Sequence, residues 1–214
     1  MNSNLRHPKI GMTSDYRKYI IQGEEYARVT DICSIIRKPG LEMWKIRVGK
    51  EESERIARET GEYGDLVHEI TALNDMNKMD EVEVMLKKHE FLLPPWVAWF
   101  DWVGEYVKEI LHVELIVWSG KMKCAGKVDR IAVMKGDNCP SILDLKTGNL
   151  YDEIGIQLHG YKKIYNEKNK RKVKRTLAVQ LPRTDPGTIK IKEYDNPKYT
   201  TSFKAAVQLY YSTK

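Results

Sequence analysis

The sequence predicts an α/β protein in which a mixed central sheet is flanked by helices and preceded by a helical N-terminal extension. Apolar residues recur at helical spacing through most of residues 1–111, and three stretches rich in Val, Ile and Leu follow. The rest of the chain alternates between helical and strand patterns, which gives the order β-β-β-α-β-β-α after the first helices. We therefore expect residues 1–214 to form one domain, with a mostly helical part at 1–111 and the sheet within 112–214.

The N-terminal part is predicted to be helical from its apolar spacing. The expected helices span residues 31–37, 41–48, 51–73, 80–90 and 94–111. Thr30 can cap the first of them, and Pro39-Gly40 ends it. Gly61 and Gly64 interrupt the third, so we expect that helix to bend or restart there.

The sheet is predicted from residue 113 onward. The expected strands span residues 113–118, 126–134, 141–146, 173–181 and 188–194. The turn chemistry of residues 135–138 joins the second strand to the third, so the first three form a meander. Helices are expected at 153–167 and 202–211, so that along the sequence one precedes and one follows the last two strands.

Composition and charge limit the class of protein. The chain has 36 Lys and Arg against 30 Asp and Glu, a formal charge of +6, which is too small an excess for a polycation. Residues 162–175 hold eight basic side chains and one acidic one, so this segment accounts for the excess. The apolar fraction of 42% argues against general disorder, and no uncharged apolar run approaches the ~18 residues of a membrane helix. The polar N-terminus lacks a signal-peptide stretch, so we expect a cytoplasmic protein with no membrane partner.

The three cysteines predict free thiols. Cys33, Cys124 and Cys139 lie far apart and form no C-x-x-C pair, which disfavours both a disulfide framework and a structural zinc site. Three thiols also fall short of the four that an iron–sulfur cluster requires.

Acidic residues on successive predicted strands indicate a metal site. Strand alternation places Asp144 and Lys146 on one face, where they either form a solvent-facing pair or line a functional cleft. Asp129 lies on the preceding strand and Glu114 on the strand before it. Three neighbouring carboxylates repel one another unless a cation neutralises them, and oxygen ligands of this kind suit Mg²⁺ or Mn²⁺.

His68, Gln157 and Tyr161 complete an ordered series of motifs. The series reads Gly64-x-x-x-His68, Glu114, Gly126-x-x-Asp129, Asp144-x-Lys146-Thr-Gly and Gln157-x-x-x-Tyr161. In this order the motifs resemble those of the RecB-like branch of the PD-(D/E)XK nuclease superfamily. The resemblance covers about residues 29–165, and the stretch 30–44 is similar to the phage and mitochondrial single-strand exonucleases of that branch. The resemblance implies a restriction-endonuclease-like core. It also implies that the protein is located in the cytoplasm of a bacterial or phage-infected cell.

The resemblance also implies a role for each motif residue. Asp129, Asp144, His68 and the backbone carbonyl of Leu145 would hold one Mg²⁺ or Mn²⁺ ion, and Glu114 would help to hold a second. Lys146 would orient the attacking water and offset charge that develops on the phosphorane, and Gln157 and Tyr161 would position Lys146 and a substrate phosphate. Because the four bracketing cysteines of the iron–sulfur members are missing, the chain is similar to the members without that cluster.

Basic and aromatic residues are candidates for contact with nucleic acid. The basic candidates are Lys162, Lys163, Lys170, Arg171 and Lys172, which follow Tyr161 directly and either track a strand or form a solvated surface. Trp99 and Trp102 lie on one side of a predicted helix, where they either pack in the core or stack on single-stranded bases.

These expectations favour a metal-dependent DNase. The favoured activity is an exonuclease on single-stranded DNA ends in replication, recombination or repair. Processive digestion would need either a protein partner of those processes or a threading channel in the nuclease itself. Two alternatives stay open: a structure-selective or nicking endonuclease, and a catalytically silent nucleic-acid-binding module on the same fold.

Overall fold

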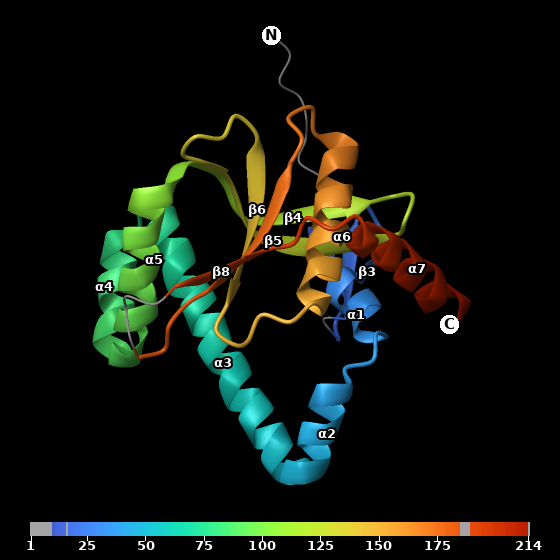
Figure 1. Cartoon of the computed structure of the whole chain (residues 1–214), viewed down its shortest axis with the longest axis horizontal. Coiled ribbons are helices and arrows are strands. Elements are labelled where there is room, and N and C mark those ends of the chain that lie inside the picture. Colours follow the sequence, from blue (N-terminus) through green and yellow to red (C-terminus); the bar gives the residue numbers. More distant parts are fainter. Residues whose placement is uncertain (1–9, 16, 185–188, 214) are drawn as a thin grey trace.

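The structure is a computed structural model, and it describes residues 10–15, 17–184 and 189–213. Its strands form one eight-stranded mixed sheet with helices on both faces, so the predicted α/β class is confirmed (Figure 1). The strands are β1 (Ile10–Met12), β2 (Lys18–Ile21), β3 (Glu24–Arg28), β4 (Val107–Ser119), β5 (Cys124–Met134), β6 (Pro140–Lys146), β7 (Arg175–Gln180) and β8 (Lys190–Glu193). The α-helices are α1 (Val29–Ser34), α2 (Pro39–Val48), α3 (Lys50–Asp75), α4 (Met79–Lys88), α5 (Leu93–Tyr106), α6 (Glu153–Lys168) and α7 (Lys198–Ser212).

The central strands follow the predicted meander. β4 pairs antiparallel with β5, β5 pairs antiparallel with β6, and β7 lies parallel to β6. The predicted end of the preceding helix at 111 is wrong, because α5 ends at Tyr106 and β4 begins at Val107. The predicted boundary between the helical part and the sheet, at residues 111 and 112, therefore falls inside β4. The predicted last strand is present as β8, although Thr188, its expected first residue, lies outside the described residues.

The N-terminal segment differs from its helical prediction. Three short strands precede the first helix, and β3 joins the main sheet by pairing parallel with β5. Gln22 and Gly23 connect β2 to β3 with φ values of 55° and 84°, which is the two-residue turn geometry of a β-hairpin. Ile21 and Tyr26 bury their side chains on one face of this hairpin, so burial stabilises strands that are individually very short.

Helices α1 and α3 also correct the sequence prediction. Arg28 occupies the N-cap position of α1 and no side chain caps this helix, so Thr30 is not a cap. α3 is one continuous helix of 26 residues, without the predicted restart at Gly61 or Gly64. Its length matters for the site, because its first half projects with α2 beyond the sheet while its second half packs on the sheet (Figure 1).

Two apolar clusters cover the two faces of the sheet. Residues of α1, α6 and α7 form the cluster on one face, and residues of α3, α4 and α5 form the cluster on the other. Leu143 and Leu145 belong to the second cluster, whereas Asp144 and Lys146 point into a pocket on the opposite side. The predicted alternation along β6 is therefore confirmed. Within the described ranges, no helix combines the length and apolar character needed to cross a membrane.

One edge of β5 is only partly paired, and this positions the site. Along one edge β5 pairs with β4 from end to end. Along the other edge it pairs with β3 at Cys124 and Ala125, and with β6 at residues 130–133. No described strand pairs with residues 126–129 on that edge. We call this stretch the sheet gap.

Candidate metal centre

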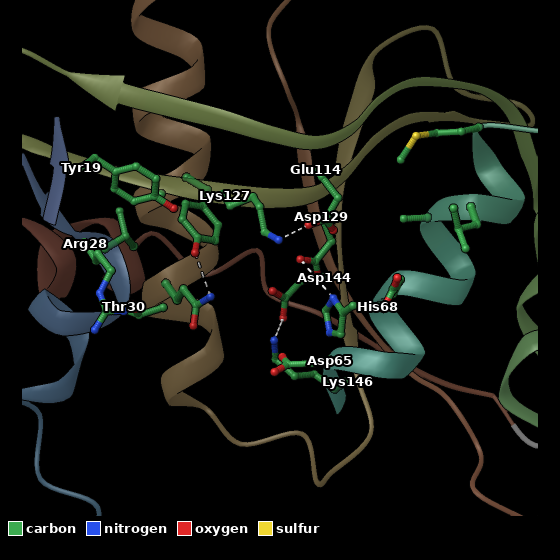
Figure 2. A pocket seen from close by; sticks show the side chains of 18 residues that line it. Tyr19, Arg28, Thr30, Asp65, His68, Glu114, Lys127, Asp129, Asp144 and Lys146 are labelled. Carbon is green, nitrogen blue, oxygen red and sulfur yellow. Dashed lines mark hydrogen bonds and ion pairs between the residues drawn. The ribbon is translucent and has the colours of Figure 1, made fainter. Parts of the chain in front are cut away.

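A pocket of about 720 Å³ lies at the sheet gap, between α1, α3 and α6 (Figure 2). The side chains predicted to form the site all line it: His68, Glu114, Asp129, Asp144, Lys146, Gln157 and Tyr161. They come from α3, three neighbouring strands and α6. The fold therefore brings together residues that lie up to 93 positions apart in the sequence, the span from His68 to Tyr161.

His68, Glu114 and Asp129 form a group that could hold a metal ion. One potential ligand atom from each lies within 4.8 Å of those of the other two, and His68 Nδ1 is 3.5 Å from Asp129 Oδ1. An imidazole nitrogen with two carboxylate oxygens is a donor set that divalent cations accept. Burial, the largest single effect, would lower the pKa of His68, but the charge of Asp129, its hydrogen bond and the charge of Asp144 together outweigh burial and raise this pKa. The neighbouring carboxylates therefore favour the protonated form of His68.

Asp129 is held by the backbone of the next strand. The pairing of β5 with β6 reaches only as far as Arg130 and Leu143, so the N–H of Leu145 is available and donates to Asp129 Oδ2 at 2.8 Å. The Leu145 carbonyl lies on the same edge of β6, because the N–H and C=O of one strand residue point the same way. Burial would raise the pKa of Asp129, but His68, Lys146 and the Leu145 N–H outweigh it and hold this pKa well below its usual value.

Asp144 and Lys146 form an ion pair at the base of the pocket. Lys146 Nζ lies 2.5 Å from Asp144 Oδ2, and both side chains are largely buried. Burial raises the pKa of Asp144, Lys146 opposes this shift, and the charge of Asp129 adds to it. Burial lowers the pKa of Lys146, but Asp144 and Asp129 outweigh it and raise this pKa, so the lysine is protonated at neutral pH.

Glu114 has an unusual backbone conformation. It lies on β4 between residues paired with Arg130 and Val128, which places it opposite Asp129. Its φ of 52° is in the left-handed region, which non-glycine residues adopt at a cost. Lys127 Nζ makes an ion pair with its carboxylate, and Arg130 Nη1 lies 3.3 Å from Oε1. The surrounding structure thus directs this carboxylate toward Asp129 despite the local strain.

Gln157 and Tyr161 form the α6 wall of the pocket. Gln157 Nε2 donates to the Tyr161 hydroxyl oxygen at 3.1 Å, as expected for side chains four residues apart on a helix. Burial raises the pKa of Tyr161 well above its usual value, so its hydroxyl keeps its proton and can donate a hydrogen bond. The ring packs directly on Gly126, where an added Cβ would lie 2.5 Å from Tyr161 Cε1. This contact is a physical reason for glycine in the Gly126-x-x-Asp129 motif.

Two glycine substitutions should separate this contact from a general effect on packing. We expect Gly126→Ala to lower the free energy of unfolding by about 1–3 kcal/mol, because Tyr161 must move, and to lower any activity of the site. Gly64→Ala is the control, since a Cβ there would lie 3.6 Å from Thr147 Oγ1, an ordinary contact. Urea denaturation of both variants checks this, and equal stability of the two would contradict the role given to Gly126.

The pocket also contains residues that the sequence analysis missed. Tyr19 and Arg28 come from the N-terminal strands, Thr30 from α1, and Lys127 from the sheet gap. Lys127 lies inside the Gly126-x-x-Asp129 motif, so its position in the sequence could have identified it as a pocket residue. Tyr19 and Arg28 could be found only by predicting the β2–β3 hairpin, for which Gln22-Gly23 between two short segments that each contain tyrosine is a weak signal.

Trp99 and Trp102 do not reach the pocket. Trp99 is fully buried and Trp102 is 6% exposed, and their rings stack with centroids 5.4 Å apart in the α3, α4 and α5 cluster. Trp99 Nε1 donates to Asp75 at 3.0 Å. The expectation that these two rings stack on bases is wrong, because the helical spacing that aligned them directs them into the core.

The basic segment after Tyr161 extends away from the pocket. The Lys174 N–H donates to the carbonyl of Pro140, at the start of β6, whereas Lys146 ends that strand. A strand of this length spans about 20 Å, so Lys170, Arg171 and Lys172 lie near the opposite end of β6 from the acidic group. Lys162 Nζ donates to the Lys174 carbonyl, while Lys163 lies in a different groove. Contact of Lys170, Arg171 and Lys172 with a substrate strand stays a prediction.

Comparison with known proteins assigns no family. No protein-family model matches the chain, and no curated protein matches it. A solved structure titled "Crystal structure of SSO0001" is similar over 85% of this chain and 75% of that chain, with 15% sequence identity and a TM-score of 0.38. Similarity at this level assigns neither a family nor an activity.

Proposed function

We propose that the protein is a metal-dependent DNA nuclease that hydrolyses phosphodiester bonds. The observation that carries the proposal is the convergence, in one pocket, of the Asp144–Lys146 pair with the His68, Glu114 and Asp129 group. A binding protein gains nothing from concentrating carboxylates where phosphates must approach, whereas a metal-dependent phosphodiesterase needs them.

The donor set fits Mg²⁺ or Mn²⁺. His68, Glu114 and Asp129 lie close enough together to share one ion. The resemblance would add Asp144 and the Leu145 carbonyl to the ligands of His68 and Asp129, and would leave Glu114 to help hold a second ion. Bound there, the cations would supply charge neutralisation and activation of a water for attack on phosphorus. The strained backbone of Glu114 and the repulsion between Asp129 and Asp144 support this role, because both cost stability in the metal-free protein.

The remaining pocket residues bind and orient the reactants. Lys146 is a protonated amine at the carboxylates, so it can hold the attacking water by a hydrogen bond and offset negative charge on the phosphoryl oxygens. Tyr161 keeps its hydroxyl proton and receives a hydrogen bond from Gln157, so it can donate to a substrate phosphate. The half-exposed Lys127 is a further cation in the pocket lining.

The resemblance of the ordered motifs supports an exonuclease on single-stranded DNA ends in replication, recombination or repair, and an endonuclease is the alternative. Covalently closed single-stranded circles and linear strands of equal length, each incubated with Mn²⁺, separate the two. We expect loss of the linear strand only. Cleavage of the circle would replace the exonuclease proposal with the endonuclease one, and no cleavage of any DNA or RNA would refute nuclease function and leave a silent binding module.

His68 gives a narrower test of the metal ligands. An imidazole among oxygen ligands favours Mn²⁺ relative to an all-oxygen site, so His68→Ala should require about tenfold more Mn²⁺ for half-maximal activity. A Mn²⁺ titration of wild type and variant measures this shift. His89→Ala is the control, since that histidine follows α4 and lines a neighbouring groove but not the pocket. Coincident titration curves for His68→Ala and wild type would remove His68 from the ligand set.

A further inference from the structure

We propose that the protein has a second nucleic-acid-binding site, a basic groove on the opposite side of α6 from the pocket, that holds the backbone of a single strand. The groove has a volume of about 450 Å³ and lies between the β4–β5 turn, α6 and α7. It is lined by Lys121, Met122, Lys123, Lys163, Lys204, Val207, Gln208 and Tyr211. The inference rests on the proposed function, because a nuclease needs a means of holding the strand that it cuts.

The charge of the groove favours a phosphate backbone. Four of its lining residues are lysines and none of the lining residues is acidic. Lys123 makes an ion pair with Glu24, but Lys121, Lys163 and Lys204 make none with any acidic side chain in the part of the chain that the structure describes. Three cations that lack a counterion within one concave surface attract a polyanion and release its counterions on binding.

The apolar part of the groove favours single-stranded rather than double-stranded nucleic acid. Tyr211 is 44% exposed, and its hydroxyl donates to the Lys123 carbonyl at 2.5 Å, which fixes the ring beside the lysines. Met122 and Val207 are half-buried beside it. An ordered aromatic ring next to cations is the combination that stacks unpaired bases while the backbone follows the charges.

The groove lies within reach of the pocket along β5. Lys123 immediately precedes β5 and Asp129 lies within it, so six residues of extended chain, about 20 Å, separate them. Lys163 follows Tyr161 by two residues on α6, which places the two side chains on opposite sides of that helix. A strand bound in the groove would therefore reach the pocket by passing around α6.

Binding in EDTA tests the groove without hydrolysis. The probe is a fluorescein-labelled 20-nucleotide oligothymidylate, and its Kd is measured by anisotropy between about 50 and 200 mM salt, the range over which phosphate contacts are lost. In the triple variant Lys121→Gln, Lys163→Gln, Lys204→Gln, we expect the slope of log Kd against log salt to fall by about 2, because each phosphate contact on a single strand contributes about 0.7. The control carries the same charge change at Lys78, the N-cap of α4, and at Lys87 and Lys88 in its last turn, and should keep the wild-type slope.

Substitutions of Tyr211 test the stacking part separately. Tyr211→Leu should weaken binding at least about fivefold, whereas Tyr211→Phe keeps the ring and should bind like wild type. An unchanged salt slope in the triple lysine variant would overturn the proposal. The proposal would also fail if the oligothymidylate bound wild type and this variant equally while a polyglutamate peptide bound only wild type. Cleavage is assayed separately with Mn²⁺, so a protein that binds through the groove but cuts nothing would refute the nuclease function and leave the groove standing.

Discussion

Asp144→Asn is expected to reduce phosphodiester hydrolysis by about 10³-fold or more while DNA binding stays intact or tightens. The substitution removes one of the buried charges that would hold the cation, and it keeps the shape of the side chain. It also removes a negative charge from the surface that faces the substrate phosphates, so binding has no reason to weaken. The measurements are single-turnover cleavage with saturating Mn²⁺ and anisotropy binding in EDTA.

The same variant should fold at least as well as wild type. Burial raises the pKa of Asp144, which means that the charged form is destabilising in the folded state at neutral pH. A neutral amide removes this cost above the ordinary pKa of an aspartate, so loss of activity would not reflect unfolding. Glu69→Gln is the matched control, since Glu69 is an exposed carboxylate on the same pocket wall and should retain activity. If the Asp144→Asn variant cleaved DNA at the wild-type rate, the reaction would have to take place outside this pocket.

Arg130→Met is expected to lower the free energy of unfolding by about 3–5 kcal/mol. Arg130 is fully buried, and its guanidinium makes an ion pair with the buried carboxylate of Asp75 on α3. It also donates to the Asp129 carbonyl at 2.7 Å and to Thr71 Oγ1 at 3.2 Å. Without it the Asp75 carboxylate would remain buried with no cation beside it, and would keep only the neutral hydrogen bonds from Trp99 and Asn74. Urea denaturation at pH 7 measures the change.

A second arginine provides the control for this prediction. Arg175 also contacts two carboxylates, those of Asp137 and Glu193, but its side chain is 40% exposed. Solvent screens exposed pairs, so Arg175→Met should cost about 0–1 kcal/mol. Equal losses in the two variants would mean that burial does not determine the cost of removing an arginine here. A large loss for Arg130 alone would show that this side chain fastens α3, and with it His68, to β5.

Local patterns were sufficient to predict the central strands and the acidic residues. The alternation of Asp144 and Lys146 with Leu143 and Leu145 depends only on strand geometry, and the structure follows it. The interpretation of Trp99 failed for a different reason. Helical spacing shows that aromatic side chains share one face, but only the packing of α5 against α3 determines whether that face is core or surface.

Other features of the site depend on which strands meet. The sheet gap arises because β3 and β6 each pair with part of one long strand, and no residue pattern within 126–129 specifies that arrangement. The hydrogen bond from Leu145 to Asp129 depends on the same partial pairing. The left-handed backbone of Glu114 was also unpredictable, because glutamate rarely adopts it and the surrounding structure imposes it.

The attachment of the N-terminal strands has a consequence for substrate entry. β3 joins β5 through two residue pairs, Ala27 with Cys124 and Arg28 with Ala125, whereas β4 pairs with β5 from end to end. Segments with few cross-strand bonds open at lower free energy than the whole protein unfolds. We therefore expect the wall of the pocket that carries Tyr19 and Arg28 to open as a flap while the acidic floor stays in place, which would let a nucleic-acid strand enter from the side. Faster amide hydrogen exchange in β1–β3 than in β4–β6, slowed by bound oligonucleotide, would be the signature of this flap.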